Sequence, residues 1–237
     1  MRKLRIAALA LVALLGCAPT ETGNPSASVD VIPQTDDVRG FAPRVGVEQF
    51  ILGGVRIDFL RGEPCDLPEP LVDVESYEAL TKRGERIELA TTLPVDTYCA
   101  VEGEVYPSAR IDGLLLAIDG TRLEDGAPVR IRAHGDALPL VMSLRESFVV
   151  PEEGVAVHFL VDVDVVISTV PALATLRANP DGVVEVDETH SPEVLAEVLA
   201  RLPNAVMVLE DTNRNGVVDG QERELPIAFG PDTVGGP

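Results

Sequence analysis

The chain has 237 residues, with 19 Lys and Arg against 39 Asp and Glu, which gives a formal net charge of −20. Hydrophobic residues make up 46% of the chain, enough for a buried core, so the composition excludes a wholly disordered protein. The acidic charge repels phosphate backbones and therefore argues against nucleic acid as a partner. The length allows one large all-β domain or two small ones.

The N-terminus has the pattern of a secretory signal. Residues 1–5 carry three basic side chains, residues 6–15 form an apolar run, and Gly16 and Cys17 follow. The run is too short for a permanent membrane span, which takes about 20 residues. Residues 14–17, with the sequence LLGC, resemble the lipobox of bacterial lipoproteins. That resemblance implies cleavage after residue 16 and lipidation of the Cys17 sulfur, whereas an ordinary signal with an incidental Cys is the alternative.

The same resemblance implies a membrane location. Ala18, not Asp, follows the Cys, which in Gram-negative lipoproteins implies export to the outer membrane, with the protein facing the periplasm or the cell surface. Several acyl chains hold a protein firmly on a bilayer. Residues 17–44 then comprise the lipidated Cys and a flexible tether rich in Pro, Thr, Ser and Asp. Residues 45–230 are the expected folded domain, and residues 231–237 are an expected disordered tail.

From residue 45 onward, short stretches alternate apolar and polar side chains, as half-buried β-strands do. Val55, Ile57 and Phe59 form the apolar side of one stretch. Turns rich in Gly and Pro separate the stretches. The pattern predicts a mainly β fold, specifically an antiparallel β-sandwich.

The most regular alternation covers residues 155–165, where every odd position is apolar. It predicts one strand over this whole range. His158, Asp162 and Asp164 fall on the even positions, so we expect them on an outer face in contact with solvent. A metal or acid–base cluster of these three residues is the alternative.

One amphipathic helix is predicted near the C-terminus. Ser191 suits an N-cap and Pro192 suits the first helical position. Apolar residues at helical spacing then continue to Leu202, and Pro203 ends the run. Residues 171–178 are a candidate for a second short helix.

Residues 93–98, with the sequence LPVDTY, resemble the turn that leads into a central strand in prealbumin-like and immunoglobulin-like domains of extracellular bacterial proteins. Asp96 stands where that pattern has Gly. The layout as a whole resembles uncharacterised envelope lipoproteins with a β-sandwich body. The likeness implies a fold and brings no activity with it.

Two cysteines remain if Cys17 is lipidated. Cys65 and Cys99 are an even pair in an oxidising compartment, which predicts a disulfide between them. Free buried thiols are the alternative, and a catalytic thiol is a third interpretation, weakened because no His lies near either Cys in the sequence.

The strongest chemical pattern covers residues 211–222, which resemble the twelve-residue calcium loop of EF-hand and dockerin-type proteins. The resemblance implies six ligands whose oxygens converge on one calcium ion. They are Asp211, Asn213, Asn215, the backbone carbonyl of Val217, Asp219 and Glu222. Gly216 matches the sixth position, where the chain must turn sharply. The flanks depart from the EF-hand, because a strand precedes the loop and Pro226 follows it, so we expect a lone structural loop. An Asn-Gly turn that binds no ion is the alternative.

These patterns favour a non-catalytic, calcium-stabilised binding or structural protein, held on the membrane by its lipid anchor. Its partner would be an envelope protein or a glycan, although the absence of Trp weakens the glycan interpretation. A periplasmic or surface hydrolase whose site is dispersed along the sequence is the alternative. The hydrolase signature G-x-S-x-G, phosphate-binding glycine loops and zinc-ligand spacings are all absent from the sequence.

Overall fold

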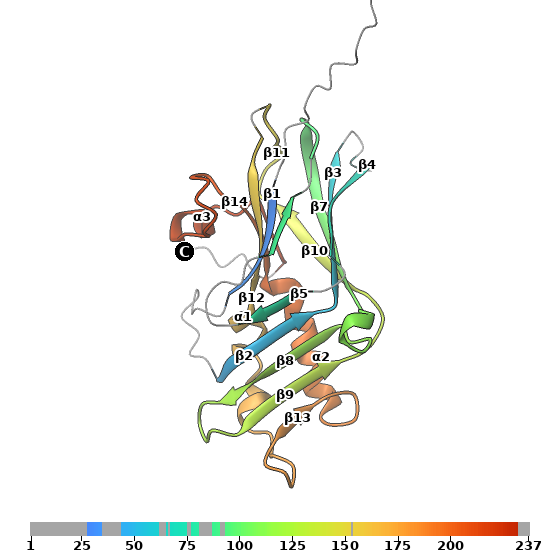
Figure 1. Ribbon diagram of the computed structural model, residues 1–237, viewed down its shortest axis with the longest axis vertical. Helices are drawn as coiled ribbons and strands as arrows, with labels where there is room; N and C mark the ends of the chain where they lie inside the picture. Colours follow the sequence, from blue (N-terminus) through green and yellow to red (C-terminus); the bar gives the residue numbers. More distant parts are fainter. Residues whose placement is uncertain are drawn as a thin grey trace, which may run out of the picture.

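The computed structural model describes residues 28–34, 44–61, 65, 67–74, 77–80, 87–90, 93–152 and 154–231. Its strands form two sheets (Figure 1). The predicted mainly β, sandwich-like fold is therefore confirmed.

The larger sheet has ten strands within the described residues. In spatial order nine of them are β4 (Leu67–Val74), β3 (Gly54–Arg61), β7 (Thr97–Tyr106), β10 (Leu138–Leu144), β15 (Ala228–Phe229), β14 (Val206–Glu210), β12 (Ala156–Asp162), β1 (Ser28–Gln34) and β6 (Ile87–Ala90). The tenth, β11 (Phe148–Val149), pairs with β7 beyond the end of β10.

The smaller sheet occupies the lower half of the molecule in Figure 1. Its order is β13 (Val184–Val186), β9 (Pro128–Ala133), β8 (Leu116–Arg122), β2 (Val45–Leu52) and β5 (Tyr77–Leu80). The helices are short: α1 (Val163–Ser168), α2 (Pro192–Arg201), α3 (Gly220–Glu224) and the 3-10 turns η1 (Ala109–Ile111), η2 (Pro171–Ala174) and η3 (Leu202–Ala205). In the described part of the chain, none of them has the length and apolar content that a membrane crossing requires.

The chain passes from the smaller sheet to the larger at Gly53, the one residue between β2 and β3. A Cβ atom at Gly53 would lie 2.1 Å from the backbone oxygen of Tyr106, and one at Gly54 would lie 2.0 Å from the Tyr106 ring. Only residues without a Cβ allow β3 to approach β7 this closely. The two sheets consequently share one hydrophobic core, to which residues from Val45 to Ala228 contribute.

The alternation predicted for β3 is confirmed. Val55, Ile57 and Phe59 are buried, whereas the Arg56 side chain is exposed. The Phe59 ring meets Tyr98 of β7 edge-to-face, with ring centroids 5.8 Å apart, and lies 5.6 Å from Phe148 of β11. Three strands of the larger sheet are therefore joined by one aromatic cluster.

The prediction for residues 155–165 is correct only in part. Strand β12 stops at Asp162, whose side chain accepts a hydrogen bond from the backbone N–H of Val165 (3.2 Å) and so caps helix α1. The predicted solvated face is wrong, because His158, Asp162 and Asp164 are 1%, 1% and 5% exposed. Both faces of β12 are covered, a situation that alternation along one strand does not reveal.

Two strand pairs depart from the expected antiparallel arrangement. Strand β1 runs parallel to β12, and β13 runs parallel to β9. The other pairs are antiparallel among the described strands. Each parallel pair joins strands far apart in the sequence, which is why the turn signals between neighbouring stretches did not predict it.

The predicted C-terminal helix is confirmed as α2, and its apolar face, which includes Val194 and Val198, is buried. Ser191 precedes it in a left-handed conformation (φ 61°) and forms no side-chain cap hydrogen bond, contrary to the expectation. The candidate helix at residues 171–178 is reduced to the 3-10 turn η2.

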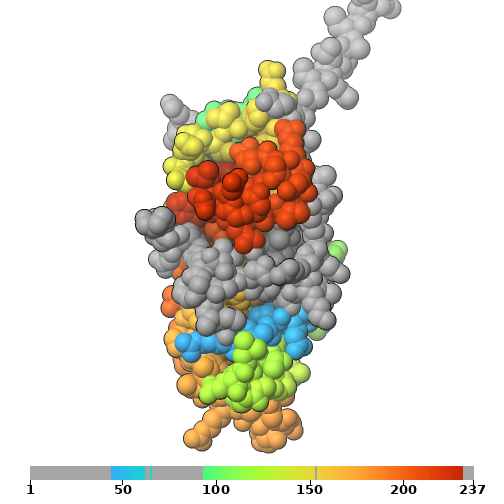
Figure 2. Space-filling view, turned by 90° about the vertical axis from the view of Figure 1, so that its left-hand side faces the viewer, coloured from blue at the N-terminus to red at the C-terminus, as the bar shows by residue number. Residues whose placement is uncertain are grey.

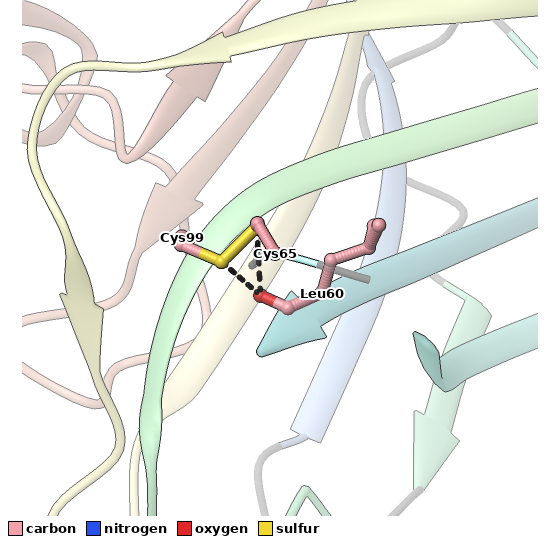
Figure 3. The surroundings of a disulfide bond; sticks show 3 residues. All are labelled: Leu60, Cys65 and Cys99. Carbon is pink, nitrogen blue, oxygen red and sulfur yellow. Dashed lines mark hydrogen bonds between the residues drawn. A yellow bond between two sulfur atoms is a disulfide. The ribbon is translucent and has the colours of Figure 1, made fainter. Parts of the chain in front are cut away.

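The disulfide prediction is confirmed: Cys65, which follows β3, is bonded to Cys99 of β7 (Figure 3). The Cα atoms are 6.0 Å apart, and 34 positions separate the two residues in the sequence. Both sulfur atoms lie against the backbone oxygen of Leu60, at 3.2 Å for Cys99 and 3.8 Å for Cys65. The bond thus attaches the segment after β3 to the strand that pairs with β3.

Candidate functional site

Residues 211–222 follow β14, include the first residues of α3 and lie on the outer face of the larger sheet. Val218 is the anchor, since it packs with Leu160, Met207 and Leu209 in a second apolar cluster, separate from the main core. Figure 1 shows α3 standing beside the end of β14. The expected strand before the loop is present as β14, and the helix at its end, α3, has only five residues.

The first half of the loop is held by its own side chains. The Asp211 carboxylate accepts hydrogen bonds from the backbone N–H groups of Asn215 (3.1 Å) and Gly216 (2.7 Å). The Asn213 side-chain oxygen accepts from Asn215 N–H (2.9 Å), and the Asn215 side-chain oxygen accepts from Val217 N–H (2.6 Å). Gly216 has the positive φ, 69°, that a sharp turn needs. These hydrogen bonds hold the backbone of the loop in a tight turn around its side-chain oxygens.

The second half of the loop is closed by a capping box. Asp219 caps helix α3 by accepting from the N–H groups of Gln221 and Glu222, and the Glu222 carboxylate accepts in return from Asp219 N–H (3.0 Å). The other Glu222 oxygen accepts from Thr212 N–H (3.1 Å), and Asn213 donates to the Asp219 carboxylate (3.0 Å). Glu222 thereby joins the two ends of the loop.

The residue types fit a hard cation. All six predicted ligands offer oxygen, and three are carboxylates, of which Asp211 and Glu222 are only 3% and 4% exposed. No Lys or Arg forms an ion pair with these carboxylates among the described residues. The carboxylates do not, however, meet at one point: in the described part of the chain, no three His, Cys, Asp or Glu side chains are arranged to hold a metal ion. Amide and backbone oxygens would have to complete the ligand set.

The structure adds one neighbour that the sequence pattern did not indicate. The Nε2 atom of His158 lies 3.3 Å from the Asp211 carboxylate, and both side chains are almost fully buried. Strand β12 brings His158 beside Leu209 of β14, two residues before Asp211. This contact joins residues 53 positions apart, so no local signal in the sequence could have shown it.

Other predicted site residues are separate from the loop. Cys17 and most of the proposed tether lie outside the described residues, as does most of the tail. Residues 28–34, which were included in the expected tether, form strand β1 and pair with β12 and β6. Cys65 and Cys99 are bonded to each other, which excludes a catalytic thiol at either position while the bond is intact.

The clearest pKa shifts occur in ion pairs of the smaller sheet. Arg122, paired with Asp125 at the β8–β9 turn, lowers the pKa of that carboxyl to about 2. After β13, a hydrogen bond from His190 to Asp187 raises the pKa of the His190 imidazole. Both pairs stabilise turns by charge-assisted hydrogen bonds.

A groove beside the loop was missed by the sequence analysis. It has a volume of about 810 Å³ and lies between residues 145–149 and the segment that carries Glu210, Leu225 and Ile227. Figure 2 faces this part of the molecule, where the yellow residues near position 145 lie above the orange-red residues of the C-terminal segment. The one feature of the sequence that could have indicated this groove is Pro226, which has no backbone N–H and therefore interrupts strand pairing.

Comparison of the chain with protein-family models, with curated proteins and with solved structures gave no match.

Proposed function

We propose that this chain is a lipid-anchored, non-catalytic protein of the bacterial cell envelope, whose β-sheet domain binds one structural calcium ion at residues 211–222. Its role is to hold an envelope partner at the outer membrane. The observation that carries the calcium proposal is the folded loop, in which the side-chain oxygens of Asp211, Asn213 and Asn215 accept hydrogen bonds from the loop's own backbone.

The expected role of calcium is structural because the loop follows directly from β14 and packs on the sheet through Val218. Val218 packs against the outer face of β12 and β14, and α3 has only five residues. A sensor loop instead moves two long helices against each other. Within the ligand set, Asp211, Asp219 and Glu222 bring negative charge, while Asn occupies two positions. Affinity falls with fewer carboxylates, so we expect a dissociation constant on the order of 10⁻⁴ M.

The first prediction concerns thermal stability. At roughly 1 mM calcium, this affinity gives about 1.4 kcal/mol of stabilisation by mass action. The melting temperature of the Cys17→Ser chain should therefore rise by roughly 3 to 6 °C relative to chelator. Glu222→Gln should lose most of that rise, because it removes the charge of the predicted bidentate ligand and keeps its shape.

Glu224→Gln is the matched control, since Glu224 is exposed at the end of α3 and outside the ligand set. It should keep the full calcium-dependent rise. Identical melting of the wild-type sequence in calcium and in chelator would show that residues 211–222 form a turn and not a metal site.

The second prediction concerns the anchor. The signal-like residues 1–16 followed by Cys17 support lipidation of the Cys17 sulfur. Labelling of cells with a fatty-acid analogue should mark the wild-type chain, which should fractionate with membranes. Cys17→Ser should lose both the label and the membrane fractionation, because the acyl chains are the attachment.

Cys65→Ser serves as the control for that experiment, since it removes a cysteine that the lipobox resemblance does not involve. It should retain the label. Equal labelling of the wild type and Cys17→Ser would contradict the proposed anchor.

A further inference from the structure

The groove beside the loop continues the line of strand β15. This strand has only two residues and lies between β10 and β14, pairing with both. Its last backbone contacts toward the groove are made by Ile227, which donates to Val208 (2.8 Å) and accepts from Arg145 N–H (3.0 Å). Pro226 comes next and has no N–H to donate, and the chain turns away into α3. Beyond Ile227 the groove opens between the segment that leads from β10 into β11 and the end of β14.

One wall of this groove is the outer edge of β11. Val150 N–H donates to the Asp96 oxygen (3.0 Å), so the backbone groups of Val150, and of Phe148 two residues earlier, point toward β7. Because antiparallel pairing alternates along a strand, the N–H and C=O of Val149 point the other way, into the groove. Among the described strands, β11 pairs only with β7. The Val149 side chain is 58% exposed.

The opposite wall is the end of β14. Asp211 N–H donates to the Ala156 oxygen (2.9 Å) on the β12 side, whereas the oxygens of Val206 and Val208 accept on the β15 side. By the same alternation, the N–H and C=O of Glu210 point to the β15 side, at the height of Pro226. Glu210 and Val149 both line the groove. The exposed edges of β11 and β14 thus border the same groove.

The side chains around the groove determine which kind of peptide strand can bind there. Glu146 and Glu210 are exposed at the groove, and the whole chain is strongly acidic. Arg145, the basic residue among the described lining residues, donates to the backbone oxygen of Glu224 (3.2 Å). Leu225 adds apolar surface, because it is 65% exposed. The groove therefore favours positive charge alternating with apolar side chains.

We infer that the groove binds an extended, basic peptide segment of a partner protein, which adds a strand in line with β15 between β11 and β14. Backbone hydrogen bonds to Val149 and Glu210 supply the pairing, and the carboxylates of Glu146 and Glu210 attract Lys or Arg side chains. This inference rests on the binding role proposed above and names the chemistry of the partner. It does not require the calcium ion or the lipid.

The test uses three blocked seven-residue peptides with a fluorescent label, titrated with the folded Cys17→Ser chain and followed by anisotropy. The first alternates Lys and Val, the second replaces each Lys by Glu, and the third is the Lys peptide with N-methylated Val residues. The Lys peptide should bind. The Glu peptide should bind at least about tenfold more weakly because of charge repulsion. The N-methylated peptide should also lose binding, because it cannot donate along one edge.

Two chain variants locate the site. Glu210→Lys should weaken binding of the Lys peptide by about tenfold or more. Glu124→Lys, which makes the same charge change at the exposed β8–β9 turn, should change it less than about twofold, since Glu124 lies outside the groove. Val149→Pro removes the groove-facing N–H and should weaken binding by roughly fivefold, whereas Val149→Ala keeps it.

The inference is overturned if the Lys peptide does not bind, if the N-methylated peptide binds equally well, or if both charge variants weaken binding to the same extent. Circular dichroism of each variant confirms that it is folded. The peptides are titrated both with calcium and with chelator, and melting is measured on the same samples. A chain that shows the calcium-dependent rise and no peptide binding contradicts this inference alone.

Discussion

Replacing both bridging cysteines, as Cys65→Ser with Cys99→Ser, is expected to lower the free energy of unfolding by about 4 kcal/mol. The bond closes a loop of 34 positions, and removing such a cross-link restores to the unfolded chain the conformational freedom that it had lost. In the folded state the bond attaches the segment after β3 to β7. Denaturant titration measures the difference, with Cys17→Ser present in both proteins so that only the bridging pair changes.

Reduction of the parent protein provides the control for this prediction. Reducing agent should destabilise the parent by a similar amount and leave the double variant unchanged. If the free energies of unfolding of the oxidised parent and the double variant differ by less than about 1 kcal/mol, the bond contributes little to stability.

Phe59→Ala is expected to destabilise the fold by about 3 to 5 kcal/mol, the range for large-to-small changes in a packed core. The Phe59 side chain is fully buried, and its ring contacts Tyr98 and Phe148, which come from two other strands of the larger sheet. Truncation leaves a cavity that both rings border. The readout is the midpoint of chemical unfolding, which should fall without a large change in slope.

Val141→Ala is the matched control, since Val141 lies in β10 of the same sheet and its side chain is 64% exposed. A surface change of this kind should stay within about 0.5 kcal/mol. Similar losses for the two variants would show that the aromatic cluster is not the centre of the core.

Local patterns in the sequence predicted the parts of this protein that local forces determine. The alternation at Val55, Ile57 and Phe59 predicted the buried side of β3, because side chains of one strand alternate by geometry. The amphipathic spacing predicted α2. The single pair of cysteines left after Cys17 predicted the disulfide, since no other partner was available.

The predictions that failed depended on contacts between distant segments. The face of β12 that carries His158 was expected to meet solvent, but the chain around residues 211–222 returns to cover part of it through Val218. The parallel pairing of β1 with β12 also depends on segments more than 100 residues apart.

The candidate site, too, has features that the local sequence predicted and features that it could not predict. The order of oxygen-bearing residues from Asp211 to Glu222 predicted a tight loop, and the loop is present with Gly216 at its turn. The contact of Asp211 with His158 and the groove above β15 could not be predicted, because each requires knowing which strands are neighbours.

The corner at Gly53 and Gly54 has a consequence for recognising relatives of this protein. A Cβ at Gly53 would meet backbone, which cannot rotate away as a side chain can, so this position stays closed to every other amino acid unless β7 moves. Gly54 faces the ring of Tyr106, its partner in the strand register. A chain that has diverged beyond detectable overall similarity would still need two adjacent glycines between consecutive strands, with an aromatic residue about 50 positions later. That spaced triplet is a more durable marker of this architecture than any of its freely exchangeable Val, Ile and Leu positions.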